Sequence, residues 1–174
     1  QELERILPTM LQASKAFEQS HQIVLVCAPH IPLSYYQSFE LSSELVCAQS
    51  HTYDTLQRAD MALVTSGTAT LETALFEVPQ VVCYKSSGLS IWLAKKIVNI
   101  KYISLVNLIL DKLVVTELIQ ETCTVEHMTL ELKKIAPQSQ GRAVQLEHYQ
   151  ALKSLLTLQE APSHLIAKSM NEYL

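Results

Sequence analysis

The residues best suited to chemistry form one short segment, Ser66-Gly67-Thr68-Ala69-Thr70-Leu71-Glu72. This segment follows an apolar run at residues 61–65 and opens a helix-forming run, which predicts a turn from a strand into a helix. The first N–H groups of a helix lack partners within it, and the helix dipole adds about half a positive charge there. Such a turn suits a phosphate or pyrophosphate. Glu72, one turn further on, could accept hydrogen bonds from a sugar diol, so the segment suggests a nucleotide site.

The same residue types also fit a purely structural role. Small residues at a strand-to-helix turn often only cap the helix, and Ser66 or Thr68 is a suitable N-cap. A lone Ser-Gly-Thr is a weak motif. From the spacing alone, a phosphate site and a plain cap both remain open.

Composition limits the class of protein. The chain has 174 residues, of which 48% are apolar, so we expect one folded domain with a sizeable core. No apolar stretch reaches the roughly 18 residues of a membrane span, and the formal net charge of -4 comes without a basic block, which argues against nucleic acid as the main partner. The N-terminus has no signal-peptide core and no initiator Met, so we expect a cytoplasmic protein and a piece of a longer chain.

The cysteines and histidines show no metal-binding pattern. The four Cys are scattered without a Cys-x-x-Cys pair, and the six His lack zinc spacing. They predict buried, reduced thiols rather than a disulfide framework, and no metal or other cofactor is expected.

Apolar periodicity predicts helices that alternate with strands. The predicted helices cover residues 2–19, 33–39, 53–59, 68–77, 88–99, 114–121, 125–135, 142–159 and 163–173, and the predicted strands cover 23–27, 44–48, 61–65, 80–84 and 102–105. This order predicts an α/β, Rossmann-like fold with a mostly parallel sheet flanked by helices, followed by C-terminal helices. We expect residues 1–141 to form the Rossmann-like domain and residues 142–174 to form helices that could pack on another domain or swap between subunits of a homodimer.

Ligands of such sheets bind at the carboxyl ends of the strands. Ser66, Lys85 and Asn107 all follow predicted strands, which strengthens the case for a nucleotide site. The chain opens on a helix, whereas a doubly wound domain opens on a central strand. We therefore expect the first strand to lie upstream of Gln1 and the isolated chain to be poorly stable.

Four blocks of sequence, in order and in register, resemble the lipid A disaccharide synthase family. They are Ala-Leu-Val-Thr-Ser-Gly-Thr-Ala-Thr-Leu-Glu at 62–72, Val-Pro-Gln-Val-Val-Cys-Tyr-Lys at 78–85, Trp-Leu-Ala-Lys-Lys at 92–96 and Lys-Tyr-Ile-Ser-Leu-Val-Asn-Leu at 101–108. Residues 1–8 resemble the helix after that family's Gly-Ser-Arg turn, so the resemblance covers most of residues 1–125 and weakens in the C-terminal helices.

The resemblance implies a two-domain glycosyltransferase of the B fold, of which this chain is the C-terminal, donor-binding half. The family transfers 2,3-diacylglucosamine from its UDP derivative to 2,3-diacylglucosamine 1-phosphate. The products are UDP and a β-1,6 disaccharide, a precursor of the lipid anchor of lipopolysaccharide. The family needs no metal, and its general base is expected in the N-terminal domain, so we place no catalytic residue here and expect this fragment alone to be inactive.

This chain departs from the family in two places. It starts after the Gly-Ser-Arg turn, so one phosphate-binding Arg is absent. It has Leu105-Val106-Asn107 where the family usually has Leu-Pro-Asn, and Leu110-Asp111 where the family usually has a Gly. These changes put the exact sugar contacts of the loop after Asn107 in doubt.

The resemblance also assigns roles within the Ser66–Glu72 segment. Backbone donors at a helix N-terminus can stabilise a diphosphate leaving group without a metal. We assign that role to Ser66, Gly67, Thr68 and Ala69, and assign the ribose hydroxyls to Glu72. The alternatives are a cap for the turn and a solvated first-turn carboxylate for Glu72.

Four further residues are candidate substrate ligands, each with a structural alternative. Lys85 could neutralise phosphate charge or be an ordinary surface lysine. Asn107 could orient the sugar or hold its own loop. Glu117 and Gln120, three apart on one face of a predicted helix, could reach sugar hydroxyls, but a solvated helix face is the simpler interpretation.

Two more segments are weaker candidates. The backbone of residues 50–54, in the loop before the phosphate turn, could contact uracil, and His51 is interpreted as a polar loop residue rather than a base. Residues 89–96 combine apolar, aromatic and cationic side chains, which fits contact with the inner membrane surface or a helix packed on the sheet.

Two other functions stay open from the sequence. One is another UDP-sugar enzyme of the same fold, such as an epimerase or the transferase of peptidoglycan synthesis. The other is a non-enzymatic α/β interaction module whose turn merely caps a helix.

Overall fold

The computed structural model describes residues 2–39, 45–85 and 101–158. Its strands are β1 (Val24–Cys27), β2 (Val46–Gln49), β3 (Ala62–Thr65), β4 (Gln80–Tyr84) and β5 (Thr116–Ile119). Its helices are α1 (Glu2–Ser14), α2 (Leu33–Gln37), α3 (Thr52–Leu56), α4 (Thr68–Leu75), α6 (Leu105–Leu110), α7 (Val125–Lys134) and α8 (Gln140–Leu158), with short 3₁₀ turns η1 (Lys15–Phe17) and η2 (Gln120–Thr122).

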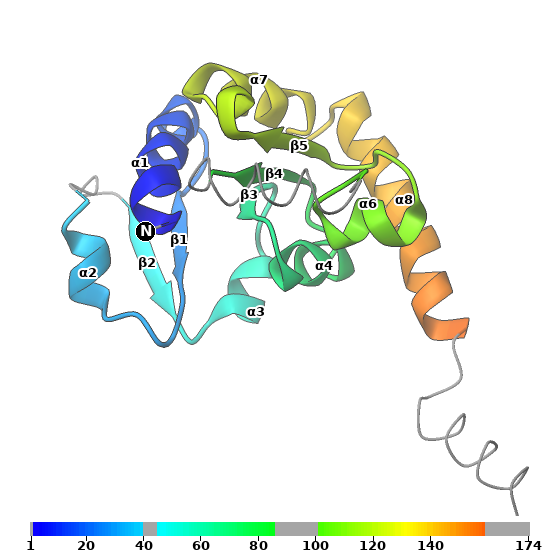
Figure 1. The fold of residues 1–174 in the computed structure, drawn as a ribbon, viewed down its shortest axis with the longest axis horizontal. Coiled ribbons are helices and arrows are strands. Elements are labelled where there is room, and N and C mark those ends of the chain that lie inside the picture. Colours follow the sequence, from blue (N-terminus) through cyan, green and yellow to red (C-terminus); the bar gives the residue numbers. More distant parts are fainter. Residues whose placement is uncertain (1, 40–44, 86–100, 159–174) are drawn as a thin grey trace, which may run out of the picture.

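Parallel strands form two sheets flanked by helices. β1 pairs with β2, and β3, β4 and β5 form a second sheet in that order. Every one of these pairs is parallel, as expected for strands that are connected through helices. The arrangement is the predicted α/β, Rossmann-like fold with a C-terminal helix, α8 (Figure 1).

β4 is the central strand of the three-stranded sheet and is buried on both faces. Val81 and Cys83 pack with Leu118 and with α7 on one face. Val82, whose side chain points to the opposite face, packs against α4, α6 and α8. Figure 1 shows the same layering, with α7 on one side of β3, β4 and β5 and with α4 and α6 on the other.

Helix α1 contacts both sheets through two different stripes. Leu3, Leu7 and Leu11 recur every four residues and join the core formed by β1, β2 and α2. A second stripe of Ile6, Met10 and Ala13 joins the core under β4 and α7. The predicted amphipathic helix is therefore apolar on two sides, since it separates two cores.

Helix α8 is fixed to the start of β4 by a buried side chain. Gln145 Oε1 accepts a hydrogen bond from the Gln80 backbone N–H at 2.9 Å, and Gln145 Nε2 donates to the Gln80 carbonyl at 3.2 Å. Tyr149 Oη donates to Gln145 Oε1 at 2.9 Å. Gln145 thus pairs with the strand as a neighbouring backbone would, and it joins α8 to the sheet.

Two predicted elements are wrong. Residues 102–105 do not form a strand, because Leu105 already begins α6 and the Ser104 hydroxyl caps that helix by accepting from Asn107 N–H at 3.2 Å. Residues 114–121 do not form a helix, because Thr116–Ile119 is β5 and pairs with β4. The β-branched run Val114-Val115-Thr116 favours a strand once β4 offers an edge to pair with.

The remaining predicted elements are confirmed to within a few residues where the structure describes them. The helices predicted at 88–99 and 163–173 lie outside the described residues. Among the helices that are described, none combines the length and the hydropathy needed to cross a bilayer.

We predict that Gln145→Ala lowers the free energy of unfolding by roughly 2–4 kcal/mol, because it removes the side-chain acceptor of the buried Gln80 N–H and one bond that the Gln80 carbonyl accepts. Gln150→Ala is the matched control, since Gln150 is an exposed glutamine on the same helix. Its effect should stay within about 0.5 kcal/mol. Urea denaturation measures both values, and equal losses would contradict the role given to Gln145.

Candidate functional site

The turn between β3 and α4 is built on a backbone conformation that only glycine adopts readily. Gly67 precedes α4 with φ 141° and ψ -163°. For any residue with a Cβ, this region of the backbone map is strained. A Cβ built on Gly67 would meet no atom within 4 Å, so the restriction comes from the backbone rather than from crowding.

The side-chain cap by Ser66 or Thr68, which the sequence left open, is not seen among the described residues. Gly67, which has no side chain, is the N-cap of α4. Ser66 instead donates its hydroxyl to the Ile103 carbonyl at 3.0 Å. The Thr70 hydroxyl donates to the Gly67 carbonyl at 2.8 Å and accepts from the Leu105 N–H at 3.3 Å. The hydroxyls of Ser66 and Thr70 therefore hydrogen-bond the turn to residues 103–105 rather than capping α4.

The first turn of α4 presents its predicted ligands on one face. Gly67, Thr68 and Ala69 are exposed and Glu72 is half-buried, whereas Thr70 and Thr73 are buried. Thr68 and Glu72 are four residues apart, so they share a face of the helix. The structure therefore brings the candidate phosphate ligands and the candidate ribose ligand together.

Lys85 follows the carboxyl end of β4 and is half-buried. Its charge helps to lower the pKa of the Cys123 thiol, although a hydrogen bond with Cys83 is the larger cause and burial opposes both. The same hydrogen bond and burial raise the pKa of Cys83. Lys85 thus lies near Cys123, at the edge of the sheet where β3 turns into α4.

Asn107 is fully buried in α6, and both ends of its amide contact protein. Oδ1 accepts from the N–H groups of Val114 and Val115 at 2.8 and 2.9 Å. Nδ2 donates to the Val115 carbonyl and to Glu117 Oε1, each at 2.8 Å. In this structure Asn107 holds the chain between α6 and β5, which is the alternative that the sequence left open.

Glu117 and Gln120 do not lie on one face of a helix as predicted. Glu117 lies on β5, and Gln120 lies in η2 with φ 52°. The carboxylate of Glu117 accepts from the N–H groups of Ile103 and Ser104 at 3.0 and 2.9 Å. The network that joins Glu117, Ser104 and Thr70 was missed by the sequence reasoning. The feature of the sequence that could have indicated part of this network is Ser104. It stands three residues before Asn107, the spacing at which an N-cap side chain accepts from a helix N–H group.

The loop predicted to contact uracil begins with a strained residue. Ser50 has φ 69°, a left-handed conformation that disfavours residues other than glycine, and it follows directly on β2. Gln49 Nε2 donates to the Ile31 carbonyl at 3.0 Å, which ties this loop to the one after β1. Beside it, Tyr53 stacks on Phe76 with ring centroids 5.3 Å apart, and Tyr53 is 57% exposed.

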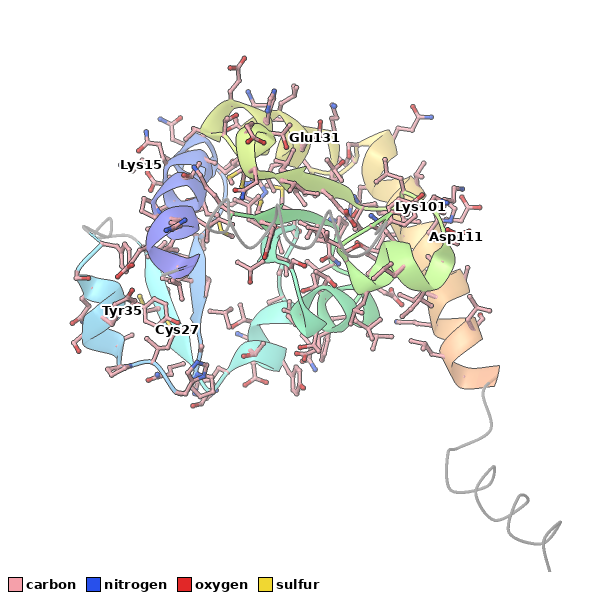
Figure 2. All side chains as sticks on the ribbon, in the orientation of Figure 1. Lys15, Cys27, Tyr35, Lys101, Asp111 and Glu131 are labelled. Atoms are coloured by element: carbon pink, nitrogen blue, oxygen red, sulfur yellow. The ribbon has the colours of Figure 1, made fainter. Side chains whose placement is uncertain are left out.

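The four cysteines are free thiols, three of them buried and Cys47 half-buried. Burial, with a smaller effect of Cys47, raises the pKa of Cys27 to about 11. Cys27 lies opposite α2 in Figure 2. Over the part of the chain that the structure describes, no three His, Cys, Asp or Glu side chains group as metal ligands.

We predict that Gly67→Ala lowers the free energy of unfolding by about 1–3 kcal/mol. The backbone of alanine is strained at φ 141°, even though its Cβ would meet no atom within 4 Å. The control is Thr68→Ala at the next exposed position, with an expected change within about 0.5 kcal/mol. Thermal and urea unfolding report both. An alanine variant as stable as the parent chain would show that this turn does not need glycine.

Comparison with known proteins gives a consistent result. The lipid-A-disaccharide synthetase family matches residues 1–169. The chain is 33% identical over 167 residues to the lipid-A-disaccharide synthase of Anaeromyxobacter dehalogenans, covering 92% of this chain and 44% of that protein. It is 37% identical over 127 residues to that of Coxiella burnetii, covering 71% and 34%, and 32% identical over 163 residues to that of Syntrophus aciditrophicus, covering 90% and 43%. The chain spans less than half the length of these relatives, and it belongs to the lipid-A-disaccharide synthetase family.

Proposed function

We propose that the complete protein is a glycosyltransferase that makes the lipid A disaccharide and that this chain binds its sugar-nucleotide donor. The donor is UDP-2,3-diacylglucosamine, the acceptor is 2,3-diacylglucosamine 1-phosphate, and UDP leaves. One observation carries the assignment of the donor site. In a member of this family, α4 begins directly after Gly67 at the carboxyl end of β3, and the Ser66 hydroxyl is donated to Ile103 rather than to the N-terminus of the helix.

The N–H groups at the start of α4 are the proposed contacts of the diphosphate. Thr68 and Ala69 are exposed in the first turn of the helix, where N–H groups have no acceptor within the helix. As the bond from the sugar to the diphosphate breaks, negative charge builds up on the leaving phosphate. Fixed dipoles and N–H donors stabilise that charge without having to reorganise. This role needs no metal, and the general base remains assigned to the other domain.

Two side chains near the turn fit supporting roles. Glu72 shares the exposed face of α4 with Thr68 and is proposed to accept hydrogen bonds from the ribose hydroxyls. Lys85, at the carboxyl end of β4, is proposed to balance phosphate charge. Sugar contacts by Asn107, Glu117 and Gln120, contact with a membrane surface and a homodimer stay predictions.

The competing functions have less support. A turn that merely caps a helix would use Ser66 or Thr68 as the cap, yet the Ser66 hydroxyl is donated to Ile103 and no side chain caps α4. An epimerase or a peptidoglycan transferase would share the fold. The relatives that match this chain, however, are named for lipid-A-disaccharide synthesis.

We also propose that one further parallel strand of the complete protein lies between β1 and β3. Among the described residues, β1 pairs only with β2, and β3 pairs only with β4. With one strand added, the order becomes that of a doubly wound sheet, whose first strand is central. We predict that amide exchange of Val26 and Leu63 is at least about tenfold slower in the complete protein than in this chain, as hydrogen-exchange mass spectrometry would measure. Equal exchange would contradict the added strand.

We predict that titration with UDP shifts the amide resonances of residues 66–72 selectively, with ADP as the control nucleotide. Glu72→Ala should weaken UDP affinity by about tenfold, because it removes the proposed charged acceptor of the ribose hydroxyls. The matched control is Glu147→Ala, which removes an exposed glutamate on α8. Absence of UDP-dependent shifts at residues 66–72 in the folded complete protein would contradict donor binding at this turn, and an unchanged affinity of Glu72→Ala would contradict the ribose assignment alone.

A further inference from the structure

The carboxylate of Glu117 is held by three donors from one short segment. Oε2 accepts from the Ile103 N–H at 3.0 Å, and Oε1 accepts from the Ser104 N–H at 2.9 Å and from Asn107 Nδ2 at 2.8 Å. Hydrogen bonds to an ionised carboxylate are stronger than those between neutral groups. Glu117 therefore fixes the backbone just before α6.

The same segment is joined on its other side to the proposed phosphate turn. The Ile103 carbonyl accepts from Ser66 Oγ at 3.0 Å, and the Leu105 N–H donates to Thr70 Oγ1 at 3.3 Å. Thr70 Oγ1 in turn donates to the Gly67 carbonyl at 2.8 Å. Residues 103–105 thus form a bridge with Glu117 on one side and the Gly67 turn on the other.

The far end of this bridge is also fixed. Asn107 receives the N–H groups of Val114 and Val115 and donates to Glu117, so the chain from α6 to β5 is closed on itself by hydrogen bonds. Since β5 pairs with β4, the bridge is connected through β5 to the central strand of the sheet. A shift of the Gly67 turn would require several of these bonds to break together.

Building on the donor site proposed above, we propose that Glu117 is a positioning residue for that site. It acts through the Ile103–Leu105 backbone, which holds Ser66 and Thr70 and so aims the N–H groups at the start of α4. Preorganised donors stabilise developing charge only where they are held to within about half an ångström. Three protein donors bind the two carboxylate oxygens, so this role of Glu117 needs no contact with the nucleotide.

A negative charge is required at this position because all three partners are donors. Glutamine has the size of glutamate but offers one acceptor oxygen and one NH₂ group. In Glu117→Gln, the NH₂ group takes the place of one carboxylate oxygen. In one orientation it faces the Ile103 N–H, and in the other it faces the Ser104 N–H and the Asn107 NH₂ group; in both cases donor meets donor. The bridge would lose at least one bond, and the Ile103 carbonyl would no longer be held in line with Ser66.

A carboxylate that binds the residue next to Glu117 on β5 provides a matched control. Glu131 on α7 accepts from Thr116 Oγ1 at 3.0 Å and pairs with Lys134. Thr116 and Glu117 are neighbours on β5, so their side chains point to opposite faces of the sheet. Figure 2 shows Glu131 on the α7 side. Glu131→Gln therefore perturbs a carboxylate bound to β5 without perturbing the bridge.

The test measures the UDP affinity of Glu117→Gln, Thr70→Val and Glu131→Gln in the complete protein, at a temperature where the amide spectrum shows each variant folded. We expect Glu117→Gln to weaken UDP affinity by about tenfold. Thr70→Val, which removes the link between Leu105 and Gly67, should weaken it in the same direction. Glu131→Gln should stay within about twofold of the parent chain. In the ligand-free Glu117→Gln variant, the amide resonances of residues 67–69 should also move.

Each outcome decides the proposal. A purely structural role for Glu117 predicts a lower unfolding midpoint with unchanged UDP affinity of the folded variant, and that result overturns it. Equal loss of affinity in Glu117→Gln and Glu131→Gln overturns it too. If Glu117→Gln does not fold, unchanged affinity in Thr70→Val overturns it instead. If the complete parent protein does not bind UDP, the proposed function fails, and the positioning role fails with it.

Discussion

The fold depends on the burial of β4 on both faces. Val81 and Cys83 face one core and Val82 the other, and all three are fully buried. A parallel strand in this position needs helices on each side to cover it, because its side chains at positions 81–83 are apolar on both faces. The placement of α4, α6 and α8 on one face and of α7 on the other follows from that requirement.

The polar network around the turn extends this arrangement to the site. The helices that cover β4 bring the N-terminus of α4 beside residues 103–105, and the hydroxyls of Ser66 and Thr70 convert that proximity into hydrogen bonds. Glycine at position 67 lets the chain turn there without a side chain in front of the helix. The apolar core thus sets where the turn lies, and the polar bridge sets how precisely it is held.

The sequence predicted the elements whose apolar pattern is strong and local. The run at 80–84 and the turn at 66–72 were placed correctly, because continuous apolar residues and a strand-to-helix change of period leave clear signals. The segment 101–121 was not, because its structure is decided by distant partners. Ile103 and Ser104 give their N–H groups to Glu117, which removes them from any strand, and Val114–Thr116 becomes extended because β4 has a free edge. The family resemblance marked Asn107, and the spacing to Gln120 suggested Glu117, but only the structure indicates that Asn107 and Glu117 contact each other.

The two stripes of α1 have a consequence for how the chain opens. Strand pairing joins β1 to β2 and joins β3, β4 and β5, and no described strand pairs across these groups. The connection between the two groups therefore depends strongly on one helix that packs into both cores. Stability in such a fold is not uniform, and contiguous units open with their own free energies. The unit formed by β1, α2 and β2 is expected to open before the three-stranded sheet. Because α1 is buried in both cores, it couples the unfolding of one unit to that of the other.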